Sequence, residues 1–442
     1  MTADVAELIR AVESREARLA VIGLGFVGAP VAAAFADAGF DVVGVDVDPR
    51  RVDAVRHGRV PFAGDEPGLA EMVAEQVAAG RLTASGSYTP LGDSRVFIIA
   101  VETPVDQDKK PRYAALRSVL ESLGPQLDEG DLVIVESTLA PGTMRDIVAP
   151  ALAESSGLAV GEELLLAHCP ERVMPGRLLA NLSGMSRVVG GVTPEAADAA
   201  AKLYEAVVRA DLDKTDALTA EIVKTGENAY RDVQIAFANE MALLCEDLGA
   251  DVWSVRELLN KSPGREMLLP GAGVGGHCIP KDPWLLVANA SESFVPRLVP
   301  AAREINDGMP HHVAAVLEDA LAEVGQPLEG ATVAVLGYAY LADSDDDRNS
   351  PSAELIEHLR GRGATVRVHD PWVADFRDRD LTDCARDADA LVIMTAHSAY
   401  GDLDLVSLRE VVRAPIVVDG RRVIDGEEHD TTGWVVRTVG VG

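Results

Sequence analysis

Two doubly wound, Rossmann-like α/β domains joined by a central domain of long helices are predicted by this sequence, from three observations. Short apolar β-rich runs alternate with helical stretches over the first half of the chain. Residues 216–248 hold no proline and repeat their apolar residues at helical spacing, which predicts one long helix. A new alternation of strands and helices starts near residue 331. The predicted domains are 1–205, 206–326 and 327–442.

The elements follow in order along the chain. The charged first 18 residues are helix-like, and no apolar signal segment is present. Apolar runs predict strands at 19–23, 40–46, 96–101, 132–137 and 164–169 in the first domain, and at 331–340, 364–370, 390–396 and 414–420 in the last. A second helical segment is predicted over 300–323, and the acidic run at 343–347 is expected to be a solvated loop.

Composition narrows the class of protein. A chain of 442 residues that is 48% hydrophobic can build more than one core. The net charge of −31 makes the average surface repel polyanions, so nucleic acid and anionic membranes are not expected as partners. A phosphate-bearing ligand must therefore be held locally, by helix ends and a few cations. The acidic surplus, with arginine far outnumbering lysine, indicates adaptation to high salt; the alternative is an ordinary acidic protein from a GC-rich genome.

The cysteines indicate a reducing compartment. Cys169, Cys245, Cys278 and Cys384 are far apart and form no C-x-x-C pair, so neither a disulfide framework nor a zinc site is predicted. No apolar run approaches the length of a membrane span. We expect a cytoplasmic protein with reduced thiols and no metal.

A dinucleotide site is predicted at the first strand-turn-helix unit. Gly23, Gly25 and Gly28 form G-x-G-x-x-G directly after a strand, and Asp46 ends the next strand. Such glycines allow a tight turn and close approach to a pyrophosphate, while the acid binds the ribose hydroxyls. The carboxylate favours NAD over NADP. NADP stays the alternative, because Arg50 and Arg51 are close in sequence. A tight turn without a cofactor is the alternative.

A second candidate site surrounds Cys278, in the glycine-rich segment 270–283. No strand precedes this segment, so it is not a second dinucleotide turn. An ordinary buried thiol is the commonest fate of a cysteine. His277, Lys281 and Asp282 argue against an apolar pocket, and a nearby cation favours the thiolate. The residues alone leave a structural and a catalytic thiol both open.

Seven motifs together carry a resemblance to a known family. They are G-x-G-F-V-G at the dinucleotide turn, VETP at 101–104, ESTLAPGT at 136–143, CPERVMPG at 169–176, the helix from Lys224 to Asn228, GVGGHCIPKDP at 273–283 and DDDRNSP at 345–351. In this order they resemble the UDP-glucose/GDP-mannose dehydrogenase family over nearly the whole chain. The resemblance implies an NAD domain, a central dimerisation domain, a UDP-sugar-binding domain and a homodimer.

The resemblance also implies catalytic roles at the matching positions. Cys278 resembles the nucleophile that captures an aldehyde as a thiohemiacetal, which a second oxidation converts to a thioester that water hydrolyses. Lys224 resembles the cation that stabilises the oxyanion, with Asn228 as a donor one helical turn away; the alternative is a solvated lysine. Asp282 and Glu171 resemble the carboxylates that manage the water and its proton, and Thr138 the residue that orders this water.

Ligand contacts follow from the same resemblance. The expected cofactor contacts are Gly23, Gly25, Phe26, Val27, Gly28, Asp46, Arg51, Thr103 and Thr138. The expected substrate contacts are Glu171, Arg172, Lys224, Asn228, Arg265, Gly275 and Arg348.

The P-E-R-V-x-P-G form, with Arg172, is similar to the branch that oxidises UDP-N-acetylhexosamines. UDP-N-acetylmannosamine is the first choice, UDP-N-acetylglucosamine the second and UDP-glucose the alternative, and the product would supply surface polysaccharide or glycan synthesis. One hydroxyl or acetamide contact decides among such epimers.

Two positions depart from the family pattern. Leu341 stands where the family usually has a lysine, so Arg348 or another residue is expected to replace that cation. Arg348 has the alternative of only flanking the helix predicted to start at Ser350 and Pro351. Ahead of the thiol segment, SPGREMLLPG replaces the usual proline-arginine pair, which makes Arg265 the substitute contact.

Two rival functions stay open. A one-step hydroxyacid dehydrogenase shares an NAD domain, a long helical region and a catalytic lysine, but has no use for Cys278. A non-catalytic NAD-binding redox regulator would use Cys278 without Lys224, Asn228 and Asp282. The NAD consumed per substrate would be two for the predicted enzyme, one for the first rival and none for the second.

Overall fold

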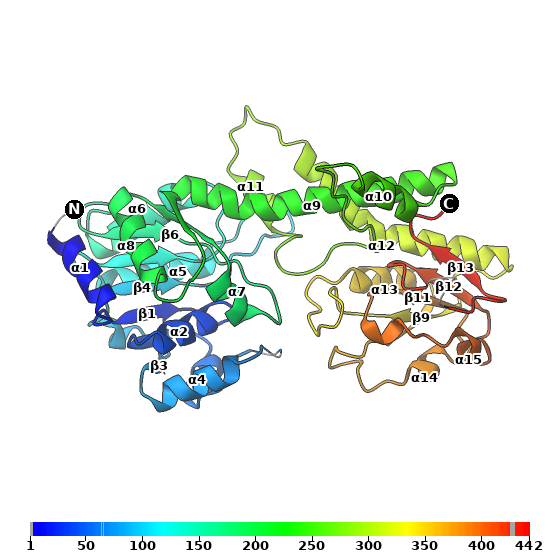
Figure 1. Cartoon of the computed structure of the whole chain (residues 1–442), viewed down its shortest axis with the longest axis horizontal. Coiled ribbons are helices and arrows are strands. Elements are labelled where there is room, and N and C mark those ends of the chain that lie inside the picture. Colours follow the sequence, from blue (N-terminus) through cyan, green and yellow to red (C-terminus); the bar gives the residue numbers. More distant parts are fainter. Residues whose placement is uncertain (1–2, 63, 65, 425–428) are drawn as a thin grey trace. The chain divides into compact units, whose positions relative to one another are not determined.

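The computed structural model describes residues 3–62, 64, 66–424 and 429–442 (Figure 1). The chain divides into two compact units. The first holds Met1–Glu227 and Trp284–Phe294, and the second holds Asn228–Pro283 and Val295–Gly442. Two helices continue across the division, α9 (Ala217–Leu248) and α11 (Asp282–Ala288).

An eight-stranded sheet is the centre of the first unit, in the order β3-β2-β1-β4-β5-β6-β7-β8 among the described residues. Its strands are β1 (Leu19–Ile22), β2 (Val42–Val45), β3 (Leu82–Ser85), β4 (Val96–Ile99), β5 (Leu132–Val135), β6 (Leu165–His168), β7 (Arg187–Gly191) and β8 (Leu212–Asp216). Neighbouring strands run parallel, except that β6 and β7 pair antiparallel.

Helices cover the sheet of the first unit. They are α1 (Ala3–Glu13), α2 (Gly28–Asp37), α3 (Pro49–Arg56), α4 (Leu69–Ala78), α5 (Ala114–Leu123), α6 (Ala149–Ser156), α7 (Leu178–Gly184) and α8 (Pro194–Tyr204). Short turns of helix add η1 (Thr89–Leu91), η2 (Gly124–Gln126) and the π-helical η3 (Met144–Val148). The central strands are buried on both faces, which explains their continuous apolar sequences.

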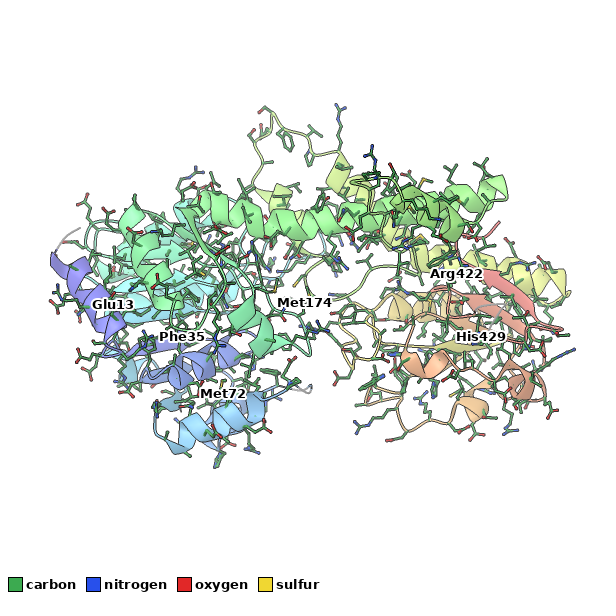
Figure 2. All side chains as sticks on the ribbon, in the orientation of Figure 1. Glu13, Phe35, Met72, Met174, Arg422 and His429 are labelled. Carbon is green, nitrogen blue, oxygen red and sulfur yellow. The ribbon has the colours of Figure 1, made fainter. Side chains whose placement is uncertain are left out.

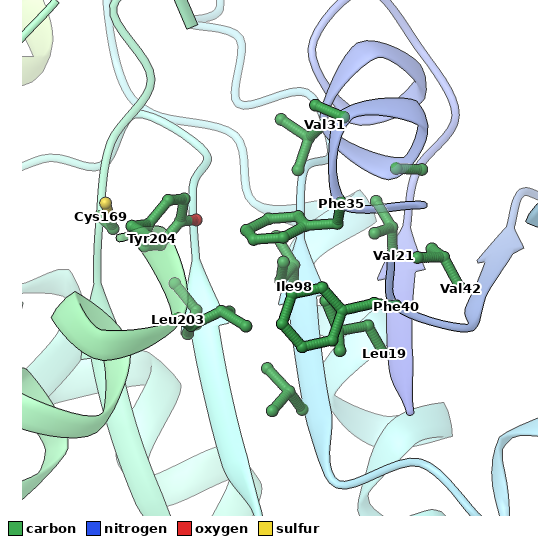
Figure 3. Close-up of a cluster of buried hydrophobic side chains, with 14 of the residues drawn as sticks. Leu19, Val21, Val31, Phe35, Phe40, Val42, Ile98, Cys169, Leu203 and Tyr204 are labelled. Carbon is green, nitrogen blue, oxygen red and sulfur yellow. The ribbon is translucent and has the colours of Figure 1, made fainter. Parts of the chain in front are cut away.

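Aromatic packing holds α2 against the core of the first unit. The ring of Phe35, on α2, lies 5.9 Å from Phe40 and 5.6 Å from Tyr204 of α8, both edge to face (Figure 3). All three rings are fully buried. Such pairs add about 0.5–1.5 kcal/mol each to the area that they bury. This packing holds the last turn of α2, while the close approach of Gly28 to Gly23 places its first turn at the end of β1, where the predicted dinucleotide site begins.

A five-stranded parallel sheet organises the second unit, in the order β10-β9-β11-β12-β13 within the described residues. Its strands are β9 (Thr332–Leu336), β10 (Thr365–His369), β11 (Ala390–Ile393), β12 (Ile416–Asp419) and β13 (Val435–Thr438). Its other elements are α10 (Val252–Asn260), α12 (Leu298–Glu323), α13 (Pro351–Gly361), α14 (Leu381–Ala385), α15 (Leu405–Arg409) and η4 (Ser398–Tyr400). Its core joins buried residues of α9 and α12 to those of the sheet.

The predicted fold class and the predicted strands are confirmed. The long helix expected over 216–248 is α9, and the one expected over 300–323 is α12. Ser350 caps α13 by accepting a hydrogen bond from the Ser352 amide, with Pro351 in the first turn, as the sequence predicted. Strands β3, β7, β8 and β13 and the antiparallel pair were not predicted. The division at residues 205 and 326 stays a prediction.

Candidate functional site

The glycines of the first turn serve two different purposes. Gly23 has φ +96°, and a Cβ there would lie 2.5 Å from the Ala100 carbonyl oxygen. A Cβ on Gly28 would lie 1.8 Å from the Gly23 oxygen, so packing inside the protein demands glycine at both positions. A Cβ on Gly25 would meet only the Arg51 guanidinium, at 3.7 Å. Open space at Gly25 is what close approach of a pyrophosphate to the backbone needs.

The start of α2 offers backbone donors to an anion. Val27, at the N-cap position, makes no side-chain capping bond, so no side chain takes the first amides of the helix. Phe26 and Val27 are half-buried against the apolar core, and the Phe26 ring lies 5.1 Å from Phe62. An uncapped helix start beside an open glycine suits the phosphates of a dinucleotide.

Asp46 is held rigidly at the end of β2. Its carboxylate is 6% exposed and accepts hydrogen bonds from the Leu24 amide at 2.7 Å and the Asp48 amide at 2.8 Å. The Arg51 guanidinium lies 3.3 Å from the same carboxylate, and Arg50 pairs instead with Asp48 at 2.8 Å. A carboxylate offers about four lone-pair sites, so Asp46 can still accept from ribose hydroxyls. Residues 23–28 and Asp46 therefore fit NAD, and both nearby arginines are paired with acids.

Two loops that follow neighbouring strands are joined. Thr103, 3% exposed in the loop after β4, donates to the Thr138 carbonyl at 2.6 Å in the loop after β5. Ser137 donates to the Val101 carbonyl at 2.6 Å. The structure thus brings Thr103 and Thr138 together at the carboxyl edge of the sheet, where cofactors bind in this fold.

Hydrogen bonds and ion pairs hold the loop after β6 at Glu171 and at Arg172. Glu171 is 6% exposed, accepts from the Arg172 amide at 2.7 Å and pairs with Arg187. The Arg172 guanidinium donates to the Ser186 carbonyl at 2.6 Å and to Glu227 of α9 at 3.1 Å. Contacts inside the protein therefore engage Arg172, and its predicted role toward the substrate stays a prediction.

The ammonium of Lys224 has no partner in the part of the chain that the structure describes. The residue is 9% exposed, and its ammonium makes no hydrogen bond or ion pair there. Burial lowers the pKa of nearby His168 to about 4, an effect that Lys224 strengthens, so this imidazole is neutral. A largely buried cation without a counterion is costly, which leaves Lys224 ready for a negative charge on a ligand.

The second unit builds a hydrogen-bonded cluster directly behind the thiol. Cys278 is exposed, and its carbonyl accepts from the amides of Lys281 and Asp282 at 3.1 and 2.8 Å. Asp282 is fully buried, accepts from the Asn228 amide group at 2.5 Å and lies 3.2 Å from the Lys281 ammonium. The structure thus brings Asn228, Lys281 and Asp282 together next to the thiol segment.

Glycines let the thiol segment approach the loop before α13. A Cβ on Gly275 would lie 2.5 Å from the Tyr340 Cβ, so no larger residue fits. The Gly276 amide donates to the Arg348 carbonyl at 2.8 Å, and Asn349 donates to the Gly276 carbonyl at 3.0 Å. Two sequence motifs, 273–283 and 345–351, therefore form one surface in the second unit.

Comparison with known proteins identifies the family. Profiles of the UDP-glucose/GDP-mannose dehydrogenase family match the chain three times: the NAD binding domain at residues 17–208, the central domain at 218–308 and the UDP binding domain at 334–426. The chain belongs to the UDP-glucose/GDP-mannose dehydrogenase family. It is accordingly an NAD-dependent UDP-sugar dehydrogenase, with NAD as cofactor.

Three relatives illustrate the range of this family. The chain is 40% identical to the UDP-N-acetyl-D-mannosamine dehydrogenase of Pyrococcus horikoshii over 96% of this chain and 99% of that protein. A solved structure of that organism's UDP-D-ManNAc dehydrogenase superposes with a TM-score of 0.90. An NDP-N-acetyl-D-galactosaminuronic acid dehydrogenase of Ralstonia solanacearum is 36% identical over 93% of this chain and 97% of its own. A UDP-glucose dehydrogenase of Pyrobaculum islandicum is 30% identical, with 96% and 98% coverage and a TM-score of 0.84.

Cys278 differs from the other cysteines of this UDP-sugar dehydrogenase. Cys169, Cys245 and Cys384 are buried, whereas Cys278 is exposed, and none of the four forms a disulfide within the described residues. No group of three or more histidine, cysteine or acidic side chains that could hold a metal is present in the described ranges. No helix of those ranges is long and apolar enough to cross a membrane.

Of the predicted substrate contacts, Arg265 makes no hydrogen bond to the described thiol segment, whereas Arg348 lies against that segment through its carbonyl. Arg265 is exposed, and its guanidinium donates to the Pro263 carbonyl at 2.9 Å; none of its hydrogen bonds to described residues reaches the thiol segment. Arg348 binds Asp346 at 2.6 Å, and Leu341 is 43% exposed. Met174, in the loop after β6, is also exposed (Figure 2).

Sequence reasoning missed the charged groups buried behind the loop after β6. Arg187 is 1% exposed and pairs with Glu136 and Glu171. Glu66 is buried and accepts from the amides of Gly176 and Leu178 at 2.8 and 3.1 Å, which fixes the end of the same loop. An arginine at the start of an otherwise apolar β-rich run, R-V-V-G-G, was the available signal for the first of these.

Proposed function

We propose that this dehydrogenase oxidises the C6 hydroxyl of a UDP-N-acetylhexosamine to the carboxylate in two successive oxidations through Cys278. UDP-N-acetyl-D-mannosamine is the proposed substrate, and its uronate would supply polysaccharide or glycan synthesis. The observation that carries the proposal is the exposed thiol of Cys278, supported by the buried Asp282 and its partners Asn228 and Lys281. A single oxidation needs no such nucleophile.

Two relatives support an N-acetylated sugar. The Pyrococcus horikoshii protein, 40% identical, is a UDP-N-acetyl-D-mannosamine dehydrogenase, and the Ralstonia solanacearum protein, 36% identical, acts on an N-acetylgalactosamine derivative by its name. The relative that oxidises UDP-glucose is 30% identical. The segment CPERVMPG, with Arg172 after the catalytic glutamate, favours the same branch.

The chemistry divides a difficult oxidation into easier steps. Two NAD molecules, bound one after the other, would each accept one hydride. After the first oxidation the Cys278 sulfur adds to the C6 aldehyde, and the resulting thiohemiacetal loses the second hydride to become a thioester. Water then attacks the thioester carbonyl, the carbon–sulfur bond breaks, and the thiolate and the carboxylate are released with a proton. One sugar thus gives two reduced cofactors.

Each remaining residue has a role suited to its surroundings. Lys224 would stabilise the negative oxygen that forms at C6, because its buried ammonium has no counterion among the described residues, and such stabilisation contributes several kcal/mol. Asp282, held by Asn228 at 2.5 Å, would accept the proton that leaves the hydroxyl. Glu171 would take the proton of the attacking water, with Thr138 helping to order it.

The test is a panel of UDP-sugars followed to completion by NADH release. Two NADH per UDP-N-acetylmannosamine are expected, with UDP-N-acetylglucosamine and UDP-glucose turning over more slowly. One NADH per sugar would indicate a simple dehydrogenase, and none would indicate a binding protein. Higher kcat/KM with UDP-glucose would contradict the proposed sugar.

The same assay with Cys278→Ser tests the nucleophile. The variant is expected to bind NAD and the UDP-sugar but to stop after a slow or stoichiometric burst, because an alkoxide is a far poorer leaving group than a thiolate. Cys245→Ser, at a buried thiol far along the chain, is the control and is expected to keep the two-to-one stoichiometry. Normal turnover in Cys278→Ser would rule out the covalent route.

We also propose that the enzyme is a cytoplasmic homodimer adapted to high salt. An apolar stripe on α9, formed by Tyr230, Phe237, Leu244 and Leu248, supports pairing with a second copy, because all four side chains are exposed at near-heptad spacing. The four free thiols support a reducing compartment. The net charge of −31 supports the saline environment.

A further inference from the structure

A buried guanidinium bridges two carboxylates behind the loop after β6. Arg187, the first residue of β7, is 1% exposed. Its Nη1 lies 3.1 Å from Glu136, the residue after β5, and its Nη2 pairs with Glu171. The guanidinium carbon lies 4.9 Å from the centre of the Tyr204 ring, and the Tyr204 hydroxyl donates to Glu136. All of these residues belong to the first unit.

Within this cluster of charged groups, Glu136 has a pKa near neutrality. Burial raises the pKa of Glu136 to about 7, although Arg187 opposes the effect. Burial also raises the pKa of the neighbouring Cys169 thiol to about 12 and holds the pKa of Tyr204 well above its usual range, so both stay neutral. Arginine stays charged. Glu136 therefore carries its negative charge mainly above about pH 7, beside an arginine that stays charged.

The geometry holds Glu171 at both oxygens. Oε1 accepts from the Arg172 amide at 2.7 Å, and Oε2 accepts from Arg187. A carboxylate fixed in this way keeps its remaining lone pairs in set directions. Arg187 is itself fixed by Glu136, and Glu136 by the Tyr204 hydroxyl, whose ring packs in the core beside Phe35 (Figure 3).

We propose that Arg187 is a positioning residue of the reaction: it aims the Glu171 carboxylate and balances its negative charge, with Glu136 as its second anchor. The inference rests on the proposed role of Glu171 in taking the proton of the attacking water. A base must be ionised and correctly oriented to act. Arg187 supplies both conditions from a place where no substrate touches it.

Variants of the two anchors should act differently on the acid limb of the pH profile of kcat. Arg187→Met leaves Glu171 buried without its counter-charge, so the limb should move up by about one to three pH units. Glu136→Gln keeps the shape and the neutral form that Glu136 takes below about pH 7, so the limb should stay in place. Arg187→Lys restores the charge but not the planar set of N–H donors that reaches both carboxylates. The acid limb should therefore return toward that of the natural enzyme while kcat stays reduced.

A matched control separates this role from simple structural support. Arg95→Lys weakens another ion pair of the same sheet, with buried Asp131 at 2.9 Å, but at the amino ends of β4 and β5. It is expected to lower the thermal midpoint without moving the acid limb. If Arg187→Met does not fold, Arg187→Lys and Glu136→Gln still give the comparison, because both keep the size of the natural side chain.

Infrared titration of the same proteins labelled with ¹³C-carboxyl glutamate reads the carboxyl groups without turnover. The Glu171 carboxyl band, assigned by its absence in Glu171→Gln, should titrate at higher pH in Arg187→Met and at the pH of the natural enzyme in Glu136→Gln. If no UDP-sugar is oxidised to the acid, the proposed function fails while this titration still decides the bridge. An unmoved acid limb and an unmoved carboxyl titration in Arg187→Met would overturn the inference, and so would an equal shift in Glu136→Gln.

Discussion

At the scale of single residues, Asp46 shows how one carboxylate can choose between two cofactors. It is held by the Leu24 and Asp48 amides, so it cannot turn away from a ligand at the end of β2. It also keeps Arg51 engaged at 3.3 Å. A 2′-phosphate at this place would meet a fixed negative charge and an arginine already paired.

Asp46→Ala is expected to weaken NAD binding and to lower the ratio of kcat/KM for NAD to that for NADP by about ten-fold or more. This change corresponds to the loss of one or two charge-assisted hydrogen bonds. Arg51, freed from its partner, would then be able to pair with the added phosphate. The measurement is kcat/KM for both cofactors. Asp53→Ala, which removes an exposed acid on α3 that pairs with Arg59, is the control for a general change in charge. Unchanged discrimination in Asp46→Ala would place the acidic partner elsewhere.

The sequence identified the candidate residues of the site, but it did not predict which residues they contact. The glycine turn and Asp46 lie within one strand-turn-helix unit, where local rules apply. The contacts that fix Glu171 join Arg187, the first residue of β7, to residues that follow β5 and β6, and only tertiary folding brings them together. The same holds for Asn228 and Asp282, which belong to different helices.

At the scale of elements, α9 carries two of the proposed catalytic residues, Lys224 and Asn228, and an exposed apolar stripe. The exposed fractions of Tyr230, Phe237, Leu244 and Leu248 are 66%, 49%, 47% and 69%, which is unusual for large apolar side chains at near-heptad positions of one helix. Contiguous apolar surface of this kind marks interaction sites. A second copy of the same helix would cover it, since the spacing is self-complementary across a two-fold axis.

Phe237→Asp and Leu244→Asp should each weaken the dimer by about ten- to a hundred-fold, because burial of one large apolar side chain contributes roughly 1.5–3 kcal/mol. Sedimentation velocity over a range of protein concentrations measures the dissociation constant. Val324→Asp makes the same change at an exposed valine after α12, outside the stripe, and should leave the dimer intact. Equal dissociation in all three variants, or a monomeric natural enzyme, would contradict the proposed dimer.

Strands were predicted where burial on both faces leaves a continuous apolar run, as in β1, β4 and β5. Strand β8, with the sequence LDKTD, is largely exposed at the edge of the sheet and has no such pattern. Strand β7 begins with Arg187 and ends in two glycines, and a Cβ on Gly190 would lie 2.6 Å from the Ala220 Cβ of α9. Close packing against a helix, which the sequence does not display, explains those glycines.

At the scale of the whole molecule, the charge of −31 acts on every ligand and on stability together. NAD and a UDP-sugar are themselves anionic, so both approach a repulsive field. The folded chain must also hold many carboxylates close to one another. Most of its ion pairs are partly exposed and contribute little each, so they do not offset this repulsion.

Salt is therefore expected to raise the thermal midpoint between 0.1 and 2 M KCl, and the KM values for NAD and the UDP-sugar should fall or hold steady. The Debye length falls from about 10 Å at 0.1 M to about 3 Å at 1 M, which screens both kinds of repulsion. In an ordinary acidic enzyme, screening of local phosphate-cation contacts would instead raise both KM values. Thermal midpoints and KM values measured across the KCl series separate the two cases, and an enzyme most stable and most active at low salt would exclude adaptation to high salt.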